Sequence, residues 1–354
     1  MPKVIRLACA ALAGSATFAL AGPAAAAYTP RLVVTGAAQG LGAAGTLTFA
    51  LTTPAADDAT ARITLYAPLG YGLTLGQPAG TKLGKAQAQA ISRILGGSTL
   101  PLAGDVIADD PAKHAGNACA PAAHQAVWLL RLNGVGQTIQ VPLYVDQVTT
   151  GAEAAFASWR IQACLPSPDV PEAQGGAKLG AKLTNIRFSL GTIFANPAVA
   201  GSHVWRTGLT PYARSSGTVD AFRAVEARST VSLPGLLGLT AVLNQRTGIV
   251  TLRSSLTENA QPVARQRVRL LLGTTTKNPK VFRTATTSAT GTLVSTIRLA
   301  SGQTRYLRAY VNVATRDDGG AGCAGTSIAP AGCVSSTRGA FTALSAGTIR
   351  IRRR

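Results

Sequence analysis

Acidic and aromatic side chains are both scarce in this sequence. Asp and Glu together number 14 against 34 Lys and Arg, and Phe, Trp and Tyr make up 5% of the chain. The hydrophobic share is nevertheless 46%, which excludes a wholly disordered chain of 354 residues. Glycine (38) and proline (19) together supply 57 residues, a composition typical of short strands joined by many turns.

Long apolar runs are missing everywhere except at the N-terminus. There, Lys3 and Arg6 precede an uncharged run that ends in a series of alanines. This is the pattern of a signal peptide, and the small residues 25–27 form the expected cleavage site. An uncleaved anchor is the alternative, because about 20 apolar residues can span a bilayer. We expect a secreted or cell-surface-associated protein with no transmembrane segment in its mature chain.

Metal-binding motifs are missing too. No Cys-x-x-Cys pair is found, so zinc is poorly supported as an explanation of the cysteines, and no metal is expected. One of the five cysteines, Cys9, falls in the signal peptide. The other four allow three pairings, of which local pairing is the simplest. We therefore predict disulfides Cys119–Cys164 and Cys323–Cys333, as suits an exported protein.

Signatures of known enzymes are also missing. No Gly-x-Ser-x-Gly elbow is present. The segment VVTGAAQGLG (33–42) resembles the glycine-rich turn of short-chain dehydrogenases, but the strand-like GTLTFALTT follows it, and no Tyr has a Lys four residues later. We predict a loop between two strands there, and neither a cofactor nor a catalytic residue. A secreted hydrolase with a site built from loops of residues 28–234 remains the alternative.

Alternation of apolar and polar residues predicts strands over most of the chain before Pro234. They fall at 31–36, 46–53, 61–68, 126–132, 138–146, 155–164 and 183–194. A final strand at the end of this part is indicated by alternation over 225–230. Trp128 and Trp159 lie on strands near the first disulfide, where we expect core packing, with a carbohydrate platform as the alternative. Residues 85–95 are compatible with a helix or a strand.

Seven further candidate strands follow Pro234. They cover 239–244, 248–256, 265–273, 280–288, 291–299, 304–315 and 341–352. Seven strands in about 110 residues predict a small immunoglobulin-like sandwich. The second disulfide would then close the irregular segment before its last strand.

Three segments of this C-terminal part resemble known modules. PVARQRVRLLLG (262–273), TATTSATGTLVSTIRL (284–299) and TRYLRAYV (304–311) are similar to bacterial immunoglobulin-like and carboxypeptidase-regulatory-like modules. The longer N-terminal part, with YAPLGYGL, VPLYVD and WRTGLTPY, is similar to uncharacterised exported two-domain proteins of GC-rich bacteria. The resemblance implies a bacterial, all-β protein and no particular activity.

The expected fold is therefore all-β, with two β-sandwich domains of which the second is immunoglobulin-like. A signal peptide (1–27) precedes a larger domain (28–234) that contains the first disulfide. A basic sandwich (235–354) completes the chain.

Positive charge is concentrated in the second domain. Residues 235–354 hold 17 Lys and Arg against three acids, a net charge of +14, whereas residues 28–234 hold 15 against 11, a net +4. Candidate anion-binding residues are Arg265, Arg267, Arg269, Arg350, Arg352, Arg353 and Arg354. Arginine binds phosphate and carboxylate through two parallel hydrogen bonds.

The charge distribution predicts a non-enzymatic surface or matrix binding module. Its basic domain would attach to an anionic cell-envelope polymer or acidic polysaccharide, with no dedicated nucleic-acid partner. Besides the secreted hydrolase, two alternatives stay open, namely a solvated arginine-rich surface with no partner and a scaffold domain of an extracellular assembly.

Overall fold

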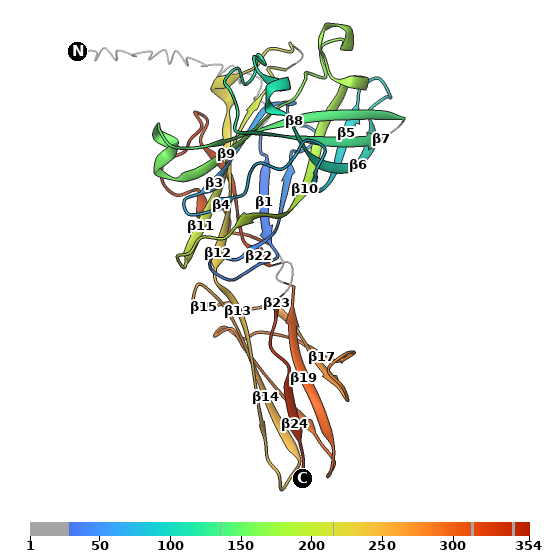
Figure 1. Ribbon diagram of the computed structural model, residues 1–354, viewed down its shortest axis with the longest axis vertical. Coiled ribbons are helices and arrows are strands. Elements are labelled where there is room, and N and C mark those ends of the chain that lie inside the picture. The colour runs from blue at the N-terminus through green and yellow to red at the C-terminus, as the bar shows by residue number, and fades with distance from the viewer. Residues whose placement is uncertain (1–27, 135, 215, 313–314, 342–343) are drawn as a thin grey trace, which may run out of the picture.

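The computed structural model describes residues 28–354 except 135, 215, 313–314 and 342–343. The predicted signal peptide and Cys9 lie outside the described residues. The described part is built of strands, with only short 3-10 helices between them, which confirms the all-β prediction. No helix in it is long and apolar enough to cross a membrane. Figure 1 shows a broad upper body and a slender sandwich below it.

The upper body is one continuous 15-stranded sheet with the order β20-β21-β12-β11-β3-β9-β8-β7-β6-β5-β10-β2-β1-β22, in which β4 also pairs with β10. The strands are β1 (Arg31–Gly36), β2 (Ala44–Thr52), β3 (Thr60–Pro68), β4 (Gly72–Leu73), β5 (Lys82–Ser92), β6 (Ser98–Asp109), β7 (Ala126–Gly134), β8 (Gln137–Gln147), β9 (Ala157–Cys164), β10 (Ala181–Ala195), β11 (Gly201–Pro211), β12 (Val225–Leu233), β20 (Arg316–Asp317), β21 (Cys333–Arg338) and β22 (Ala340–Phe341). The predicted strands of this part are confirmed, and residues 85–92, left open between helix and strand, belong to β5.

Two layers of this sheet face each other across the core. Phe49 on β2 contacts Trp205 on β11, with ring centroids 5.1 Å apart. Trp128 on β7 is 1% exposed and belongs to the same core, as predicted, while the half-buried Trp159 donates its indole N–H to the carbonyl of Tyr71. The sheet folds over on itself, so one continuous sheet provides the packing of a sandwich.

A late segment of the chain joins the two ends of the folded sheet. Strand β21 pairs in parallel with β12, and β22 pairs in parallel with β1. The Thr337 hydroxyl donates to the carbonyl of Leu32 at 2.7 Å. Gly339 lies between the two strands, where a Cβ would meet the Thr230 carbonyl oxygen at 2.8 Å, so only glycine fits this close approach.

The second disulfide belongs to this returning segment. Residues after 234 were all expected in the second domain, but residues 316–341 complete the first sheet. Cys323–Cys333 therefore holds a loop against β12 instead of against the last strand of the sandwich. The prediction missed this because β12 and β21 are separated by 99 residues, 234–332.

The lower body is a sandwich of two sheets. One sheet contains β13 (Gly235–Leu243), β14 (Ile249–Glu258), β15 (Gln261–Pro262) and β18 (Thr292–Arg298); the other contains β16 (Arg267–Gly273), β17 (Lys280–Thr286), β19 (Thr304–Val311), β23 (Leu344–Ser345) and β24 (Ile349–Arg352). Among the seven longer strands, β13, β14 and β18 thus lie in one sheet and face β16, β17, β19 and β24 in the other. This arrangement is immunoglobulin-like, with the fourth strand paired to the third. The first six predicted strands each match a strand of this sandwich, whereas the seventh, 341–352, corresponds to the end of β22 in the upper body and to the short strands β23 and β24.

An ion pair between a partly exposed arginine and a buried glutamate connects the two bodies. Arg316 of β20 donates to both oxygens of Glu258 at the end of β14, at 3.0 and 3.2 Å. Burial raises the pKa of the Glu258 carboxyl above its ordinary range, although Arg316 and Arg338 oppose the shift. The backbone N–H of Gly235 also donates to the carbonyl of Gln39. The sandwich is therefore tied to the upper body by side-chain and backbone contacts as well as by the chain.

Candidate functional site

The outer face of the second sandwich sheet carries the basic residues. On β16, Val268 and Leu270 are buried in the core, so Arg267 and Arg269 point to solvent. The same alternation operates on the neighbouring strands β19 and β24, whose buried residues are also aliphatic. Apolar residues that fill the sandwich core thus force the residues between them onto one outer surface.

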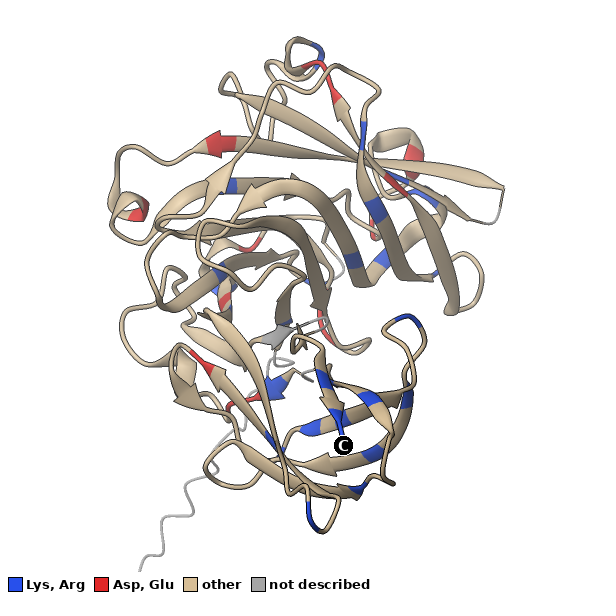
Figure 2. Cartoon of the chain, turned by 60° about the horizontal axis from the view of Figure 1, so that its bottom comes forward, with Lys and Arg blue, Asp and Glu red and all other residues tan. Residues whose placement is uncertain are grey.

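We call this surface the Arg–Tyr face. Its members are Arg267, Arg269, Tyr306, Arg308, Tyr310, Arg350 and Arg352. The five arginines are exposed and the two tyrosines are half-buried. Figure 2 shows basic residues gathered on the strands around the C-terminus.

Strand register interleaves the arginines with the tyrosines. Arg269 lies directly opposite Tyr310 on the adjacent strand, and Tyr306 lies directly opposite Arg350. Arg308 lies between the two tyrosines along β19. Directly opposite side chains in an antiparallel pair have Cβ atoms about 4.5–5.5 Å apart. The guanidinium groups therefore form a cluster that spans three strands.

Acidic residues do not neutralise this cluster. None of its five arginines forms an ion pair with a described residue. Residues 235–312 and 344–354, which make up the sandwich, contain 15 Lys and Arg and a single acid, Glu258. That acid is buried at the junction with Arg316, so the outer face keeps its full positive charge.

The structure brings together four of the seven predicted anion-binding residues. Arg265 lies in the turn before β16, with a positive φ of 58°. Arg353 donates to the backbone carbonyls of Gln245, Arg246 and Leu299, which gives it a role in the fold. Arg354 ends the chain, and its backbone N–H bonds the Gln245 side chain.

The sequence-based prediction missed Arg308 and the two tyrosines. The signal was present in TRYLRAYV, where Tyr306, Arg308 and Tyr310 share one phase of the alternation. A count of charges does not show on which side of its strand each arginine lies. It therefore included Arg265, Arg353 and Arg354, which lie off the face, and passed over Arg308.

Both predicted disulfides are present. The Cα atoms of Cys119 and Cys164 are 6.3 Å apart, and those of Cys323 and Cys333 are 5.5 Å apart. The first disulfide fixes the loop before β7 against β9, and Gln162 donates to the carbonyl of Cys119. Its surroundings are those of a structural bond.

Two histidines of the upper body, His114 and His124, have carboxylate partners. His124 contacts Asp146 through Nδ1 at 3.1 Å and the Ala120 carbonyl through Nε2 at 3.1 Å, so both of its ring nitrogens are occupied. His114 contacts Asp109 at 2.8 Å, and this hydrogen bond lowers the pKa of the Asp109 carboxyl. Among the described residues no three His, Cys, Asp or Glu side chains gather as metal ligands would.

The segment that resembles a dehydrogenase turn is a hairpin loop. It connects β1 to β2, which pair in antiparallel register, as predicted. A dinucleotide site needs a helix after the glycines. Strand β2 occupies that place.

Comparison with known proteins adds little to this description. No protein-family model matches the chain, and no curated protein matches it. The D0-D1 domain of intimin is similar at 9% identity, covering 92% of this chain and 100% of that chain, with a TM-score of 0.20. Dimeric latent PorU from Porphyromonas gingivalis is similar at 9% identity over 89% of this chain and 34% of that chain, also with a TM-score of 0.20. Scores this low leave the function to be argued from the residues of this chain.

Proposed function

We propose that the protein is an exported, non-enzymatic binding module that attaches to an anionic polymer through the Arg–Tyr face. The observation that carries this proposal is the cluster of five exposed arginines on one sheet face, without an acidic partner among the described residues. Like charges held together repel one another, and bound anions relieve that repulsion.

The shape of the face favours a polymer over a small anion. It is an exposed sheet surface spanning β16, β19 and β24. Arginine donates paired hydrogen bonds to carboxylate or phosphate groups, and neighbouring tyrosines offer ring faces and hydroxyl groups. A cell-envelope polymer or polysaccharide with regularly spaced anionic groups fits these features. The two disulfides suit the oxidising environment outside the cytoplasm.

The test is retention of the mature chain on immobilised heparin, used as the anionic probe, with elution by salt. In the test variant, Arg269→Gln/Arg308→Gln, two charges are removed from the Arg–Tyr face. In the control, Arg253→Gln/Arg298→Gln, two exposed arginines are removed from β14 and β18 of the opposite sheet. Both variants lose the same net charge.

We expect the face variant to elute at clearly lower salt than the control. The slope of log affinity against log salt should decrease by about two, because each lost cation–anion contact lowers it by about one. Equal behaviour of the two variants would show that net charge, and not this face, governs retention. Absence of retention of the unmodified chain at low salt would overturn the proposal.

A further inference from the structure

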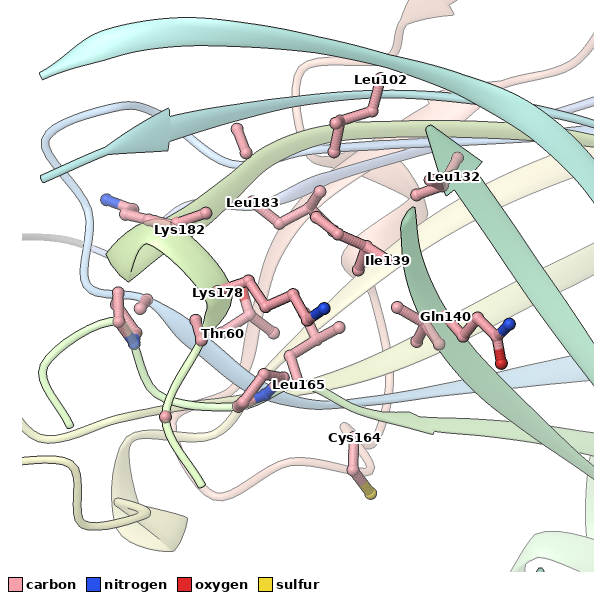
Figure 3. Close-up of a pocket in the computed structure, with 18 of the residues that line it drawn as sticks. Thr60, Leu102, Leu132, Ile139, Gln140, Cys164, Leu165, Lys178, Lys182 and Leu183 are labelled. Atoms are coloured by element: carbon pink, nitrogen blue, oxygen red, sulfur yellow. The ribbon is translucent and has the colours of Figure 1, made fainter. Parts of the chain in front are cut away.

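A pocket of about 340 Å³ opens into the upper body, far in sequence from the Arg–Tyr face. Its inner wall is formed by β5 to β8 and by β10, and the loop 165–178 covers it. The apolar wall includes Ala90, Leu102, Leu132, Ile139, Leu183 and Ile186. Figure 3 shows the labelled leucines and Ile139 converging on this space.

A small residue on β5 leaves room in the wall of the pocket. There β5 contributes Ala90, whereas the neighbouring strands β6 and β7 contribute Leu102 and Leu132. A separate, smaller cavity of about 40 Å³ has an apolar lining in the core, and Val141, Leu165 and Ile186 line both cavities. The pocket therefore adjoins the apolar core of the upper body.

Two lysines stand among the few polar groups of the lining. Lys182 donates to the backbone carbonyls of Ala55 and Asp57, and burial lowers the pKa of its ammonium group. Lys178 is exposed and forms no ion pair with a described residue. Figure 3 shows Lys178 extending into the space from the covering loop. One acid, Glu172, also lines the pocket, so the lysines outnumber it.

The covering loop is held in an unusual conformation next to Lys178. Leu179 has a φ of 56°, in the left-handed region that non-glycine residues rarely adopt. Its carbonyl accepts a hydrogen bond from the Ser92 hydroxyl at 2.7 Å, and the Ala177 N–H donates to the Ser167 carbonyl at 2.7 Å. Such conformations persist where surrounding contacts impose them, and they gather at ligand-binding sites.

We propose that this pocket binds a single-chain amphiphile with a carboxylate head, such as a fatty acid. Its alkyl chain would lie among the alanines and leucines, and its head would meet the Lys178 ammonium at the opening. Ligand pockets of a few hundred Å³ are mostly apolar with a few well-placed polar groups, as this one is. The excess of lysine over acid selects a negative head over a positive one.

The test measures binding of laurate and of dodecyltrimethylammonium to the full mature chain by calorimetry, below the micelle concentrations of both. The two probes share a twelve-carbon chain and differ in the charge of the head. We expect laurate to bind with one-to-one stoichiometry and at least about tenfold more tightly, as a charge-assisted contact to Lys178 predicts.

Three variants locate the site. Ala90→Phe fills the pocket and should abolish laurate binding. Lys178→Glu should weaken laurate binding about tenfold or more and strengthen binding of the cationic probe. Lys85→Glu is the matched control, because Lys85 is exposed on the outer face of β5, the strand that carries Ala90. This variant should leave the affinities for both probes unchanged.

Failure to bind laurate, equal binding of both probes, or equal effects of Lys178→Glu and Lys85→Glu would overturn the proposal. Lys178 is exposed, so its variant remains informative should Ala90→Phe fail to fold. Heparin retention of Ala90→Phe should match that of the unmodified chain. A failure here is thus distinguishable from a failure of the proposed polymer attachment.

Discussion

At the residue scale, the most heavily bonded charged pair is Glu226 with Arg228 on β12. Their side chains are 0% and 3% exposed. The Arg228 guanidinium donates to Glu226 and to the carbonyls of Gly322, Ala324 and Thr326. Glu226 also accepts the N–H of Ile328 at 2.9 Å. One ion pair therefore organises the whole disulfide-closed loop over β12.

Replacing Glu226 by Gln should lower the free energy of unfolding by about 3–5 kcal/mol, because Arg228 is left buried without its counter-charge. The measurement is chemical denaturation of the purified chain. Glu172→Gln, which changes an exposed acid with no ion pair to a described residue, is the control and should have little effect. Equal stability of the two variants would contradict this role of the pair.

Acid should destabilise the protein through Asp58. Burial alone would raise the pKa of this carboxyl, but Arg223 at 2.6 Å and Arg214 at 3.2 Å outweigh burial and hold the pKa below its ordinary 3.8. A lowered pKa in the folded state stabilises the protein above the unfolded value, and this contribution is lost as the pH falls through the folded value. Unfolding free energy should therefore fall below about pH 4.

The measurement is the denaturation midpoint between pH 7 and pH 2 for the unmodified chain and for Asp58→Asn. The variant should be less stable at pH 7 and should lose less stability on acidification. A constant difference between the two chains across this range would show that Asp58 does not contribute to the acid dependence.

At the scale of elements, alternation in the sequence predicted the strands but not their partners. Ile186 and Phe188 point inward on β10, and Val268 and Leu270 do so on β16, in the alternation that predicts each strand. Alternation reports which side of a strand is buried, and that information is local. Pairing of β21 with β12 depends on contacts between distant residues, which a local pattern does not contain.

Local sequence patterns are equally silent on which distant residues meet in a candidate site. Arg267, Arg269, Arg350 and Arg352 were predicted to bind anions from the charge of their domain, and the strand register then places them on one face. The pocket left no signal in the sequence, because Ala90 lies in an alanine-rich stretch that is compatible with an ordinary strand or helix. The burial of Asp57 and Asp58 left no local signal either, because their partners Thr29 and Arg214 lie 28 and 156 residues away along the chain.

The second disulfide should protect β21 specifically. In Cys323→Ser/Cys333→Ser the free energy of unfolding should fall by about 3 kcal/mol, because the disulfide that closes this short loop is lost. Hydrogen exchange at the β21 amides should also become faster. Cys119→Ser/Cys164→Ser is the matched control and should leave β21 exchange slow. Faster β21 exchange in both variants would show that the bond acts on overall stability alone.

At the scale of the whole molecule, the chain passes between the two bodies three times. It leaves the upper body after β12, returns before β20 and leaves again after β22. Neither body is therefore a continuous stretch of sequence. The expected boundary at 235 marks the first crossing only.

A fragment of residues 28–234 should consequently lack the strands that cover the β1 and β12 edges and should associate through those exposed edges. Adding a peptide of residues 315–341, with its disulfide formed, should restore a monomer by pairing with β12. Size-exclusion chromatography measures the change, and the same peptide with Thr337→Pro should be inactive. A fragment that is monomeric by itself would contradict this dependence.

The order in which the chain is made gives the returning segment a further consequence. Strand β12 is complete 99 residues before β21 begins, so the growing chain must carry an unfinished upper body while the sandwich strands are added. Glu226 and Arg228 gain their burial only when the segment after residue 320 arrives. A prematurely terminated chain keeps both charges and two strand edges in water. A compact upper body therefore requires that synthesis has passed residue 341, where β22 ends.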